Sequence, residues 1–585
     1  MSASTSIATP MQTQSTAIPV QGSTGLSQDS NSLALLRNLR TYVARLTLLL
    51  VGTLVPALLP VLFPAATASA QSPATAVPAP RLLQQNGHYA LLVNGKPFLV
   101  LGGQINNSSA WPATMPDVWP LMAAIHANTV EAPVYWEQME PKPGDFDFSN
   151  VDMLVQQARA HSMHLVLLWF GTWKNGEDHY VPEWVKSNPA KYPRVIDERG
   201  EPIQVLTANS EANLDADRTA FVALMHHLAQ IDRDTHTILL VQVENESGSI
   251  GAVRDHSPQA NREFDGPVPQ AVLEAMHKSP GSWRQVFGFA ADQYFQAYSV
   301  ARYINAIAAA GKKEFNIPMY CNVWLQYPRG YQIRGYLLPG FDYPSGGPVQ
   351  SNIAIWKAVA PSIDMLGPDL YSSDRGFERT VMETYRRADN PLWIPETGSD
   401  NAFSAEFWEA LGRGAIGFSP FGTDQTGWTF QPGDIPHSLA ANYALIGPID
   451  QEVAQLNLEG KLQTAAEELG TTEETLHFGR WNAFVGFGAR QPDGEAHAPG
   501  TAHHDGHALV AQIGPDDFLV TGTNCRVTFL LAPGQVGHMQ ILRAEQGSYH
   551  GSEWKPQRIL NGDQTDRGIN FGSGIQYVQV HLGTY

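Results

Sequence analysis

The sequence predicts an α/β protein: a (β/α)8 barrel, or TIM barrel, followed by a C-terminal β-sandwich domain. Apolar strand candidates alternate with amphipathic helical segments along most of the chain, and short strands separated by Gly and Asp turns make up its last part. Near-continuous apolar strands need cover on both faces, which favours a closed parallel barrel wrapped in helices. A doubly wound open sheet is the alternative fold for the same alternation.

Eight apolar segments are candidates for the barrel strands. The first follows a hairpin signal at Asn94-Gly95 and ends at Gln104. The other seven are residues 128–136, 164–171, 238–246, 318–324, 363–371, 392–398 and 415–422. We therefore expect the barrel over residues 86–437, a helical connector over residues 438–469 and the β-sandwich over residues 470–585.

The N-terminal part has the order of features that is typical of a signal peptide. Basic residues within 37–45 precede an apolar run over 46–63, and small residues over 66–70 complete a cleavage site. We expect residues 1–70 to be a signal peptide with a long disordered start, and residues 71–85 to be a linker. The mature protein is then periplasmic or secreted and has no stable membrane insertion. A retained anchor is the alternative, which Pro56 and Pro60 within the apolar run oppose.

Composition and charge narrow the class of partner. Hydrophobic residues make up 43% of the chain and charged residues 16%, which is typical of a compact globular enzyme. The formal net charge of −19 disfavours binding to nucleic acid and is compatible with a neutral carbohydrate. The only cysteines, Cys321 and Cys525, are expected to be buried free thiols, with a single disulfide as the alternative.

Two glutamates end predicted barrel strands, where the reacting groups of this fold lie. Glu246 follows Asn245 at the end of one strand, and Glu396 ends the segment LWIPE. Retaining glycoside hydrolysis needs two carboxyl groups about 5 to 5.5 Å apart, one as acid/base and one as nucleophile. This mechanism needs no Lewis acid, so we expect no metal and no cofactor. The histidine-rich stretch 497–507 is interpreted as a solvated loop rather than a metal site.

Four segments resemble glycoside hydrolase family 35, the β-galactosidases, which belongs to clan A of barrel glycosidases. They are VQVENESGS (241–249), EPKPGDFDFSNVDMLVQQA (140–158), FGTWKNGEDHYVPEWV (170–185) and LWIPETG (392–398). The resemblance implies that Glu246 is the acid/base, that Glu396 is the nucleophile and that Asn245 binds the sugar 2-hydroxyl.

Further sugar contacts are implied by the same resemblance. Asn175 and Glu177 match residues that contact galactose hydroxyls, and Tyr371 matches the tyrosine that hydrogen-bonds the nucleophile. The sequence also departs from the family, because it has Gln104-Ile105-Asn106-Asn107 in place of His-Tyr-x-Arg after the first strand. Tyr135 is then a candidate for a phenol that the family places nearby. Aromatic faces that could stack on a sugar or pack in the core are those of Trp136, Trp173, Trp324 and Trp428.

The sequence therefore predicts a retaining exo-β-galactosidase that hydrolyses terminal β-galactosyl residues of oligosaccharides or plant cell-wall polysaccharides. The altered motif after the first strand leaves open a clan A enzyme of other specificity, a β-glucosidase or an α-L-arabinosidase. A non-catalytic carbohydrate-binding protein is a third hypothesis, which the presence of both Glu246 and Glu396 opposes. Nothing in the sequence fixes the oligomeric state.

Overall fold

The computed structural model describes residues 77–327, 338–400, 402–424, 435–468, 470–487 and 505–585. The expected signal peptide and residues 71–76 of the expected linker lie outside these residues, so the signal peptide stays a prediction. Among the helices within the described ranges, none is long and apolar enough to cross a membrane.

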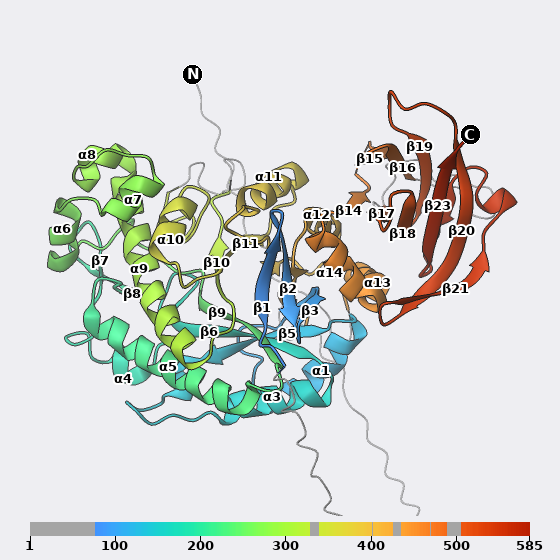
Figure 1. Cartoon of the computed structure of the whole chain (residues 1–585). Coiled ribbons are helices and arrows are strands. Elements are labelled where there is room, and N and C mark those ends of the chain that lie inside the picture. Colours follow the sequence, from blue (N-terminus) through green and yellow to red (C-terminus); the bar gives the residue numbers. More distant parts are fainter. Residues whose placement is uncertain (1–76, 328–337, 401, 425–434, 469, 488–504) are drawn as a thin grey trace, which may run out of the picture. The chain divides into compact units, whose positions relative to one another are not determined.

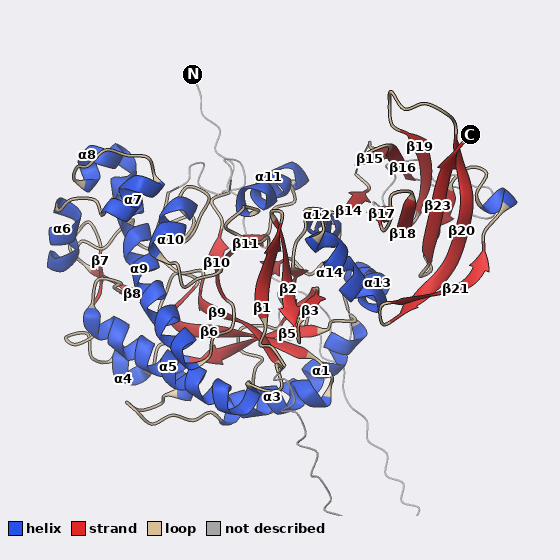
Figure 2. Ribbon diagram, viewed as in Figure 1, coloured by secondary structure: helices blue, strands red, loops and turns tan. Residues whose placement is uncertain are grey.

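Eight parallel strands form the sheet of the barrel (Figures 1 and 2). Each coincides with a segment that the sequence predicts to be a strand, and only β6 extends beyond its predicted end: β4 (Val100–Gln104), β5 (Thr129–Tyr135), β6 (His164–Lys174), β9 (Ile238–Asn245), β10 (Met319–Trp324), β11 (Met365–Leu370), β12 (Glu396–Thr397) and β13 (Gly417–Phe418). Their order in the sheet is β12-β11-β10-β9-β6-β5-β4-β13. A parallel bridge between Ile394 and Phe418 joins the two edges. The predicted closed barrel is confirmed, and the open-sheet alternative is wrong.

Helices cover the outside of this sheet because each has one apolar face (Figure 2). In α3, for example, the residues at helical spacing, Val151, Leu154, Val155 and Ala158, are all buried. The helices between the strands are α1 (Met115–Ala124), α2 (Trp136–Met139), α3 (Ser149–Ala160), α4 (Glu183–Lys186), α5 (Glu211–Asp232), α6 (Pro258–Asp265), α7 (Gln270–Ala275), α8 (Trp283–Phe287), α9 (Ala291–Glu314), α10 (Ile353–Val359), α11 (Arg375–Tyr385) and α12 (Glu406–Gly412). Packing of these helices on the strands gives one large continuous core.

A small antiparallel sheet precedes the barrel. It contains β1 (Arg81–Gln85), β2 (His88–Val93) and β3 (Lys96–Phe98). The β2–β3 turn has positive φ at both central residues, 53° at Asn94 and 79° at Gly95, as a type I′ hairpin requires. The hairpin is therefore where the sequence predicts it. Ordered structure begins earlier than expected, since β1 lies within the expected linker and pairs with β2 over its whole length.

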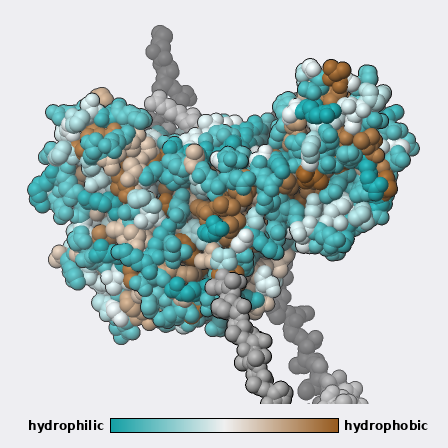
Figure 3. All heavy atoms as spheres, in the orientation of Figure 1, coloured by the Kyte–Doolittle hydropathy of each residue, from teal (hydrophilic) through white to brown (hydrophobic). Residues whose placement is uncertain are grey.

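The C-terminal domain is a β-sandwich of two antiparallel sheets, in the orders β14-β17-β18-β23-β20-β21 and β15-β16-β19-β22. Its strands are β14 (Leu462–Ala466), β15 (Glu473–Phe478), β16 (Trp481–Phe487), β17 (His507–Gln512), β18 (Asp517–Thr523), β19 (Cys525–Leu531), β20 (Met539–His550), β21 (Glu553–Ile559), β22 (Ile569–Phe571) and β23 (Tyr577–Thr584). The inner faces of both sheets share one apolar core. Hydrophilic residues cover most of the face of the molecule in view in Figure 3.

The helical connector is shorter than expected. It consists of α13 (His437–Ile446) and α14 (Asp450–Leu458). The sandwich then begins at Leu462 rather than at residue 470, because β14 pairs with β17 over five residues. The sequence of β14, LQTAA, has no alternation of apolar and polar residues that would separate it from the preceding helix, so only the pairing identifies it as a strand.

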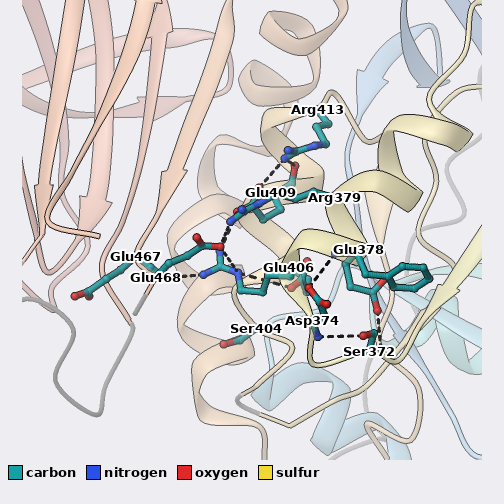
Figure 4. Close-up of polar contacts among 12 residues, drawn as sticks. Ser372, Asp374, Glu378, Arg379, Ser404, Glu406, Glu409, Arg413, Glu467 and Glu468 are labelled. Carbon is teal, nitrogen blue, oxygen red and sulfur yellow. Dashed lines mark hydrogen bonds and ion pairs between the residues drawn. The ribbon is translucent and has the colours of Figure 1, made fainter. Parts of the chain in front are cut away.

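Charged side chains from α11, α12 and the end of β14 form a group that we call the Arg–Glu cluster (Figure 4). Its members are Arg375, Arg379, Arg413, Glu406, Glu409 and Glu468. Glu409 is at the centre, with Arg375 and Arg379 each 2.9 Å away and Arg413 at 2.6 Å. Arg379 also pairs with Glu468, which follows β14. The cluster therefore ties two barrel helices to the first strand of the sandwich.

Candidate active site

A pocket of about 1000 Å³ opens at the C-terminal ends of the barrel strands. Polar residues predominate in its lining, and several aromatic rings lie among them. The described lining residues are Asn106, Asn107, Ser108, Ser109, Thr114, Lys174, Asn175, Glu246, Trp324, Tyr327, Asp369, Tyr371, Glu396, Gly398, Ser399, Asp400, Phe403, Phe421 and Gly422. A concave site of this size, with charged groups at its base and aromatic rings in its wall, suits a sugar.

Glu246 lies immediately after β9 and is 7% exposed. Its φ of 45° and that of Glu244, 64°, are uncommon for residues other than glycine. Two hydrogen bonds hold this strained end of the strand. The Glu246 N–H donates to Asn322 Oδ1 at 2.9 Å. The Trp173 N–H donates to Glu244 Oε2 at 2.7 Å. Strain that neighbouring contacts maintain is common where a side chain must point in a set direction for function.

Glu396 opens β12, which pairs in parallel with β11. Two donors reach its carboxylate from different strands. Tyr371, just after β11, donates its hydroxyl to Oε1 at 2.8 Å, and Gln104, at the end of β4, donates Nε2 to Oε2 at 3.1 Å. Both oxygens are therefore held, and the carboxylate is directed into the pocket that it lines.

A third carboxyl group, Asp369 on β11, lies beside the two glutamates. One carboxylate oxygen from each of Glu246, Asp369 and Glu396 lies within 4.8 Å of the others. Burial and the negative charge of Glu396 raise the pKa of Glu246 to about 7, although Lys174 and a hydrogen bond with Asp369 act in the opposite direction. Burial and the charges of Glu396 and Glu246 raise the pKa of Asp369 well above its usual range. A group with a pKa near neutrality can give and take a proton at the pH at which most enzymes work.

The same three carboxyl groups are the described cluster whose spacing could hold a metal ion. Hard divalent cations accept sets of carboxylate oxygens. The raised pKa values of Glu246 and Asp369 mean, however, that a cation there must compete with protons. The expected absence of a metal remains a prediction.

Lys174 supplies the positive charge of the pocket. It ends β6 and pairs in register with Asn245 of β9, so the two residues lie side by side. Its Nζ donates to Asn245 Oδ1 at 2.8 Å. Lysine can only donate, so this bond fixes the amide with its oxygen toward Lys174. Asn245 Nδ2 then has no hydrogen-bond partner in the described structure, although it is fully buried. A donor left in this way is available to a bound sugar.

A tight turn after Lys174 brings Asn175 to the pocket. Asn175 and Gly176 have φ values of 55° and 73°, as in a type I′ turn, and the Lys174 N–H donates to Glu177 O at 2.9 Å. A side chain at position 176 would collide with Ile250 and Pro344. Glycine at 176 therefore allows both the turn and its close packing.

The structure brings some of the predicted site residues together and leaves others apart. Glu246, Glu396, Asn175, Tyr371 and Trp324 line the pocket, with Asn245 held beside them. Residues predicted to contact the sugar that do not line it are Glu177, Tyr135 and Trp173. Trp136 is buried in the core, and Trp428 lies outside the described residues.

The three residues that do not line the pocket make contacts elsewhere. Glu177 is partly exposed and pairs with His179 at 3.3 Å. Tyr135 is buried against Trp111 and Tyr180, and its hydroxyl accepts the Ala110 N–H at 3.1 Å. Trp173 packs edge-on against Tyr303 in the core and is 1% exposed. Their proposed sugar contacts stay predictions that this geometry does not favour.

Sequence reasoning missed Lys174 and Asp369, which line the pocket, and Gln104, which binds Glu396. Gln104 and Asp369 lie at or near the ends of predicted strands, a signal that could have identified them. Lys174 lies beyond the predicted end of its strand, because β6 continues to residue 174 instead of ending at 171.

Both cysteines are free and buried, as expected.

The fold and the pocket together define a class of protein: a (β/α)8 barrel with paired carboxylates at the C-terminal ends of its fourth and seventh strands. Residues 90–292 match the model of glycosyl hydrolases family 35, which confirms the resemblance seen in the sequence. This match includes Asn245 and Glu246 and ends before Glu396. Residues 439–572 match a domain of unknown function, DUF5597.

Known proteins are similar over parts of the chain. A β-galactosidase of Xanthomonas manihotis is 31% identical over 175 residues, which are 29% of this chain and 26% of that protein. The chain thus spans about a quarter of the length of this curated relative. Among solved structures, the β-galactosidase of Bacillus circulans sp. alkalophilus has 15% identity and a TM-score of 0.43, covering 61% of this chain and 57% of that one. The β-galactosidase of the psychrophilic Marinomonas ef1 has 13% identity and a TM-score of 0.44, covering 63% and 62%.

Proposed function

We propose that this protein is a retaining exo-β-galactosidase that hydrolyses terminal β-galactosyl residues of oligosaccharides or plant cell-wall polysaccharides. The observation that carries the proposal is the close approach of Glu246 and Glu396 in one pocket, with oxygens within 4.8 Å of each other. Carboxyl groups about 5 to 5.5 Å apart belong to retaining glycosidases, whereas inverting enzymes need about 6.5 to 9.5 Å to admit a water molecule.

The environments of the two glutamates suit different roles. Glu246 has a pKa raised to about 7 by burial and by the charge of Glu396, so it is protonated in mildly acidic solution and acts as the acid. Glu396 accepts hydrogen bonds from Tyr371 and Gln104, which hold it for attack on the anomeric carbon. The glycosidic oxygen leaves with the proton of Glu246, and a glycosyl ester forms on Glu396.

In the second half of the reaction Glu246 is a carboxylate and removes a proton from water. The water attacks the anomeric carbon, and the bond to Glu396 breaks. Two displacements at one carbon restore the β configuration. The preference for galactose rests on the family match and on the named relative, which is a β-galactosidase.

The test is the hydrolysis of 4-nitrophenyl β-galactoside compared with the β-glucoside and the α-L-arabinoside. We expect the galactoside to have the highest kcat/KM, and proton NMR to detect β-galactose as the first-formed sugar. A first-formed α anomer would contradict the retaining mechanism. Faster hydrolysis of another glycoside would contradict the sugar preference, and no hydrolysis of any of the three would favour a carbohydrate-binding protein.

A further inference from the structure

Asp369 is a buried carboxyl group of the pocket that a two-carboxylate mechanism leaves without a role. It lies on β11 in register with Trp324 on one side and Glu396 on the other. The side chain is 1% exposed and lines the pocket. An isolated buried carboxylate is costly, so such a group is usually paired with a cation or protonated. Among the described Lys, Arg and His side chains, none forms an ion pair with Asp369 at 4.0 Å or less.

The two oxygens of Asp369 have different surroundings. Oδ2 accepts a hydrogen bond from Asn322 Nδ2 at 3.0 Å. The orientation of this amide is fixed, because Asn322 Oδ1 accepts the Glu246 N–H at 2.9 Å. Oδ1, in contrast, receives no N–H or O–H from the residues that the structure describes. One oxygen is therefore an acceptor, and the other is free to carry a proton.

The neighbour of Asp369 on the pocket side is Glu246, and one carboxylate oxygen of each side chain lies within 4.8 Å of the other. A hydrogen bond between two carboxyl groups exists only when one of them is protonated. Other titratable or charged groups that interact with the pair are Glu396, Lys174, Tyr371, Tyr327, Tyr320 and Tyr385. Only Lys174 among these is a cation, and its Nζ is bound to Asn245.

We propose that Asp369 is a positioning residue that acts as a neutral carboxylic acid, donating its Oδ1–H to the Glu246 carboxylate while Oδ2 accepts from Asn322. This inference rests on the proposed function, because it assigns Asp369 a role in the action of Glu246. The pKa of Asp369, raised by burial and by the charges of Glu396 and Glu246, agrees with a neutral group. The pattern matches that of an asparagine, with an acceptor on one side and a donor on the other.

The bond has most effect in the second half of the reaction. Before the first step Glu246 carries its own proton, and the bond joins two neutral groups. In the glycosyl-enzyme Glu246 is a carboxylate, so the bond from Asp369 becomes charge-assisted and about twice as strong. It then holds the base that must accept a proton from water, and Asp369 keeps its own proton throughout.

The test compares Asp369→Asn with Asp369→Leu. Asparagine reproduces both hydrogen bonds, so we expect kcat within about 3-fold of the wild-type value. Leucine has a similar volume but no donor, and loss of a hydrogen bond to a charged group should lower kcat about 10- to 100-fold. Because deglycosylation slows, KM should fall with kcat, and a burst of nitrophenol should appear. An Asp369→Asn variant as impaired as Asp369→Leu would overturn the proposal.

The pH dependence of activity gives a second readout. On substitution of Asp369 by leucine, its basic limb moves in opposite directions according to whether Asp369 is neutral or ionised. Activity should fall as Glu246 loses its proton near pH 7. If Asp369 is neutral, leucine removes a bond that favours ionised Glu246, so the basic limb moves to higher pH, and asparagine leaves it in place. If Asp369 is ionised, both substitutions remove a negative charge and move the limb to lower pH, which would contradict the proposal.

A spectroscopic measurement separates this proposal from the proposed function. The infrared difference between wild type and Asp369→Asn at about pH 6 should contain the C=O stretch of a neutral carboxyl group. This band does not depend on turnover, so it tests Asp369 even if the protein hydrolyses no glycoside. Its absence would overturn the proposal, and thermal midpoints of both variants establish that they are folded.

Discussion

Three neighbouring carboxyl groups of the pocket and the three of the Arg–Glu cluster differ in the number of cations that accompany them. Glu246, Asp369 and Glu396 share one lysine, Lys174. The glutamates of the Arg–Glu cluster share three arginines (Figure 4). The pocket is therefore short of positive charge, and the cluster is nearly balanced. The two regions show how the same side chain is given opposite properties within one protein.

Glu409 and Glu246 illustrate the difference. Burial acts to raise the pKa of Glu409, but the hydrogen bond and charge of Arg379, with Arg413 and Arg375, outweigh it and lower the pKa. In the pocket the single lysine does not outweigh burial and Glu396, and the pKa of Glu246 rises to about 7. Glu409 thus keeps a fixed charge, while Glu246 can exchange its proton.

Glu406 shows that a buried glutamate of the Arg–Glu cluster does not always have a lowered pKa. It is 2% exposed and lies 3.8 Å from Arg375. Burial raises its pKa to about 7, and the arginines reverse this only in part. Direct contact with several cations, rather than their presence nearby, is what keeps a buried carboxylate ionised.

The largest expected effect is a loss of activity on substitution in the pocket, which the same substitution in the Arg–Glu cluster should not cause. Glu396→Gln removes the nucleophile, and we expect kcat on 4-nitrophenyl β-galactoside to fall by at least about 10³-fold. The matched control is Glu409→Gln, the same change in the Arg–Glu cluster, which should leave kcat within about 3-fold. Steady-state kinetics of both purified variants check this, and normal turnover by Glu396→Gln would disprove its role as nucleophile.

In the Arg–Glu cluster, unlike in the pocket, we expect the substitution to change stability rather than activity. Glu409→Gln leaves arginines without their central partner, and we expect it to lower the free energy of unfolding by about 1 to 3 kcal/mol at neutral pH. The folded-state pKa of Glu409 is below its unfolded value, so its contribution is present above the unfolded pKa and is lost as pH falls through the folded pKa.

Urea denaturation of wild type and Glu409→Gln across the acid range measures this contribution. The difference between the two proteins should narrow below about pH 4.5, where unfolded glutamate is protonated. A difference that is independent of pH would mean that packing, rather than charge, accounts for the loss.

The smallest expected effect concerns Lys174. Lys174→Met removes the cation of the pocket, and its charge acts to lower the pKa of Glu246. We expect the basic limb of the kcat/KM profile to move to higher pH by roughly 0.5 to 1 unit, because one favourable charge interaction is lost. A shift to lower pH would show that Lys174 does not act on Glu246 through its charge.

The sequence alone determined the features that depend on local pattern. Apolar runs at strand length, separated by helical periodicity, predict the barrel, and the polar residues that end two of these runs predict Glu246 and Glu396. Asn94-Gly95 predicts its hairpin because few residues accept positive φ in succession. The barrel and the hairpin are confirmed, and both glutamates line the pocket, because each of these features depends on residues that are neighbours in the chain.

Only the tertiary structure decided which other groups meet the two glutamates. Lys174 reaches Asn245 because β6 and β9 pair in a particular register, and Asn322 joins Asp369 to Glu246 across three strands. Glu177, next to Asn175 and its turn in sequence, instead pairs with His179 outside the pocket. Register and side-chain direction depend on packing between distant segments, so the proton state of Asp369 follows from contacts that no local pattern records.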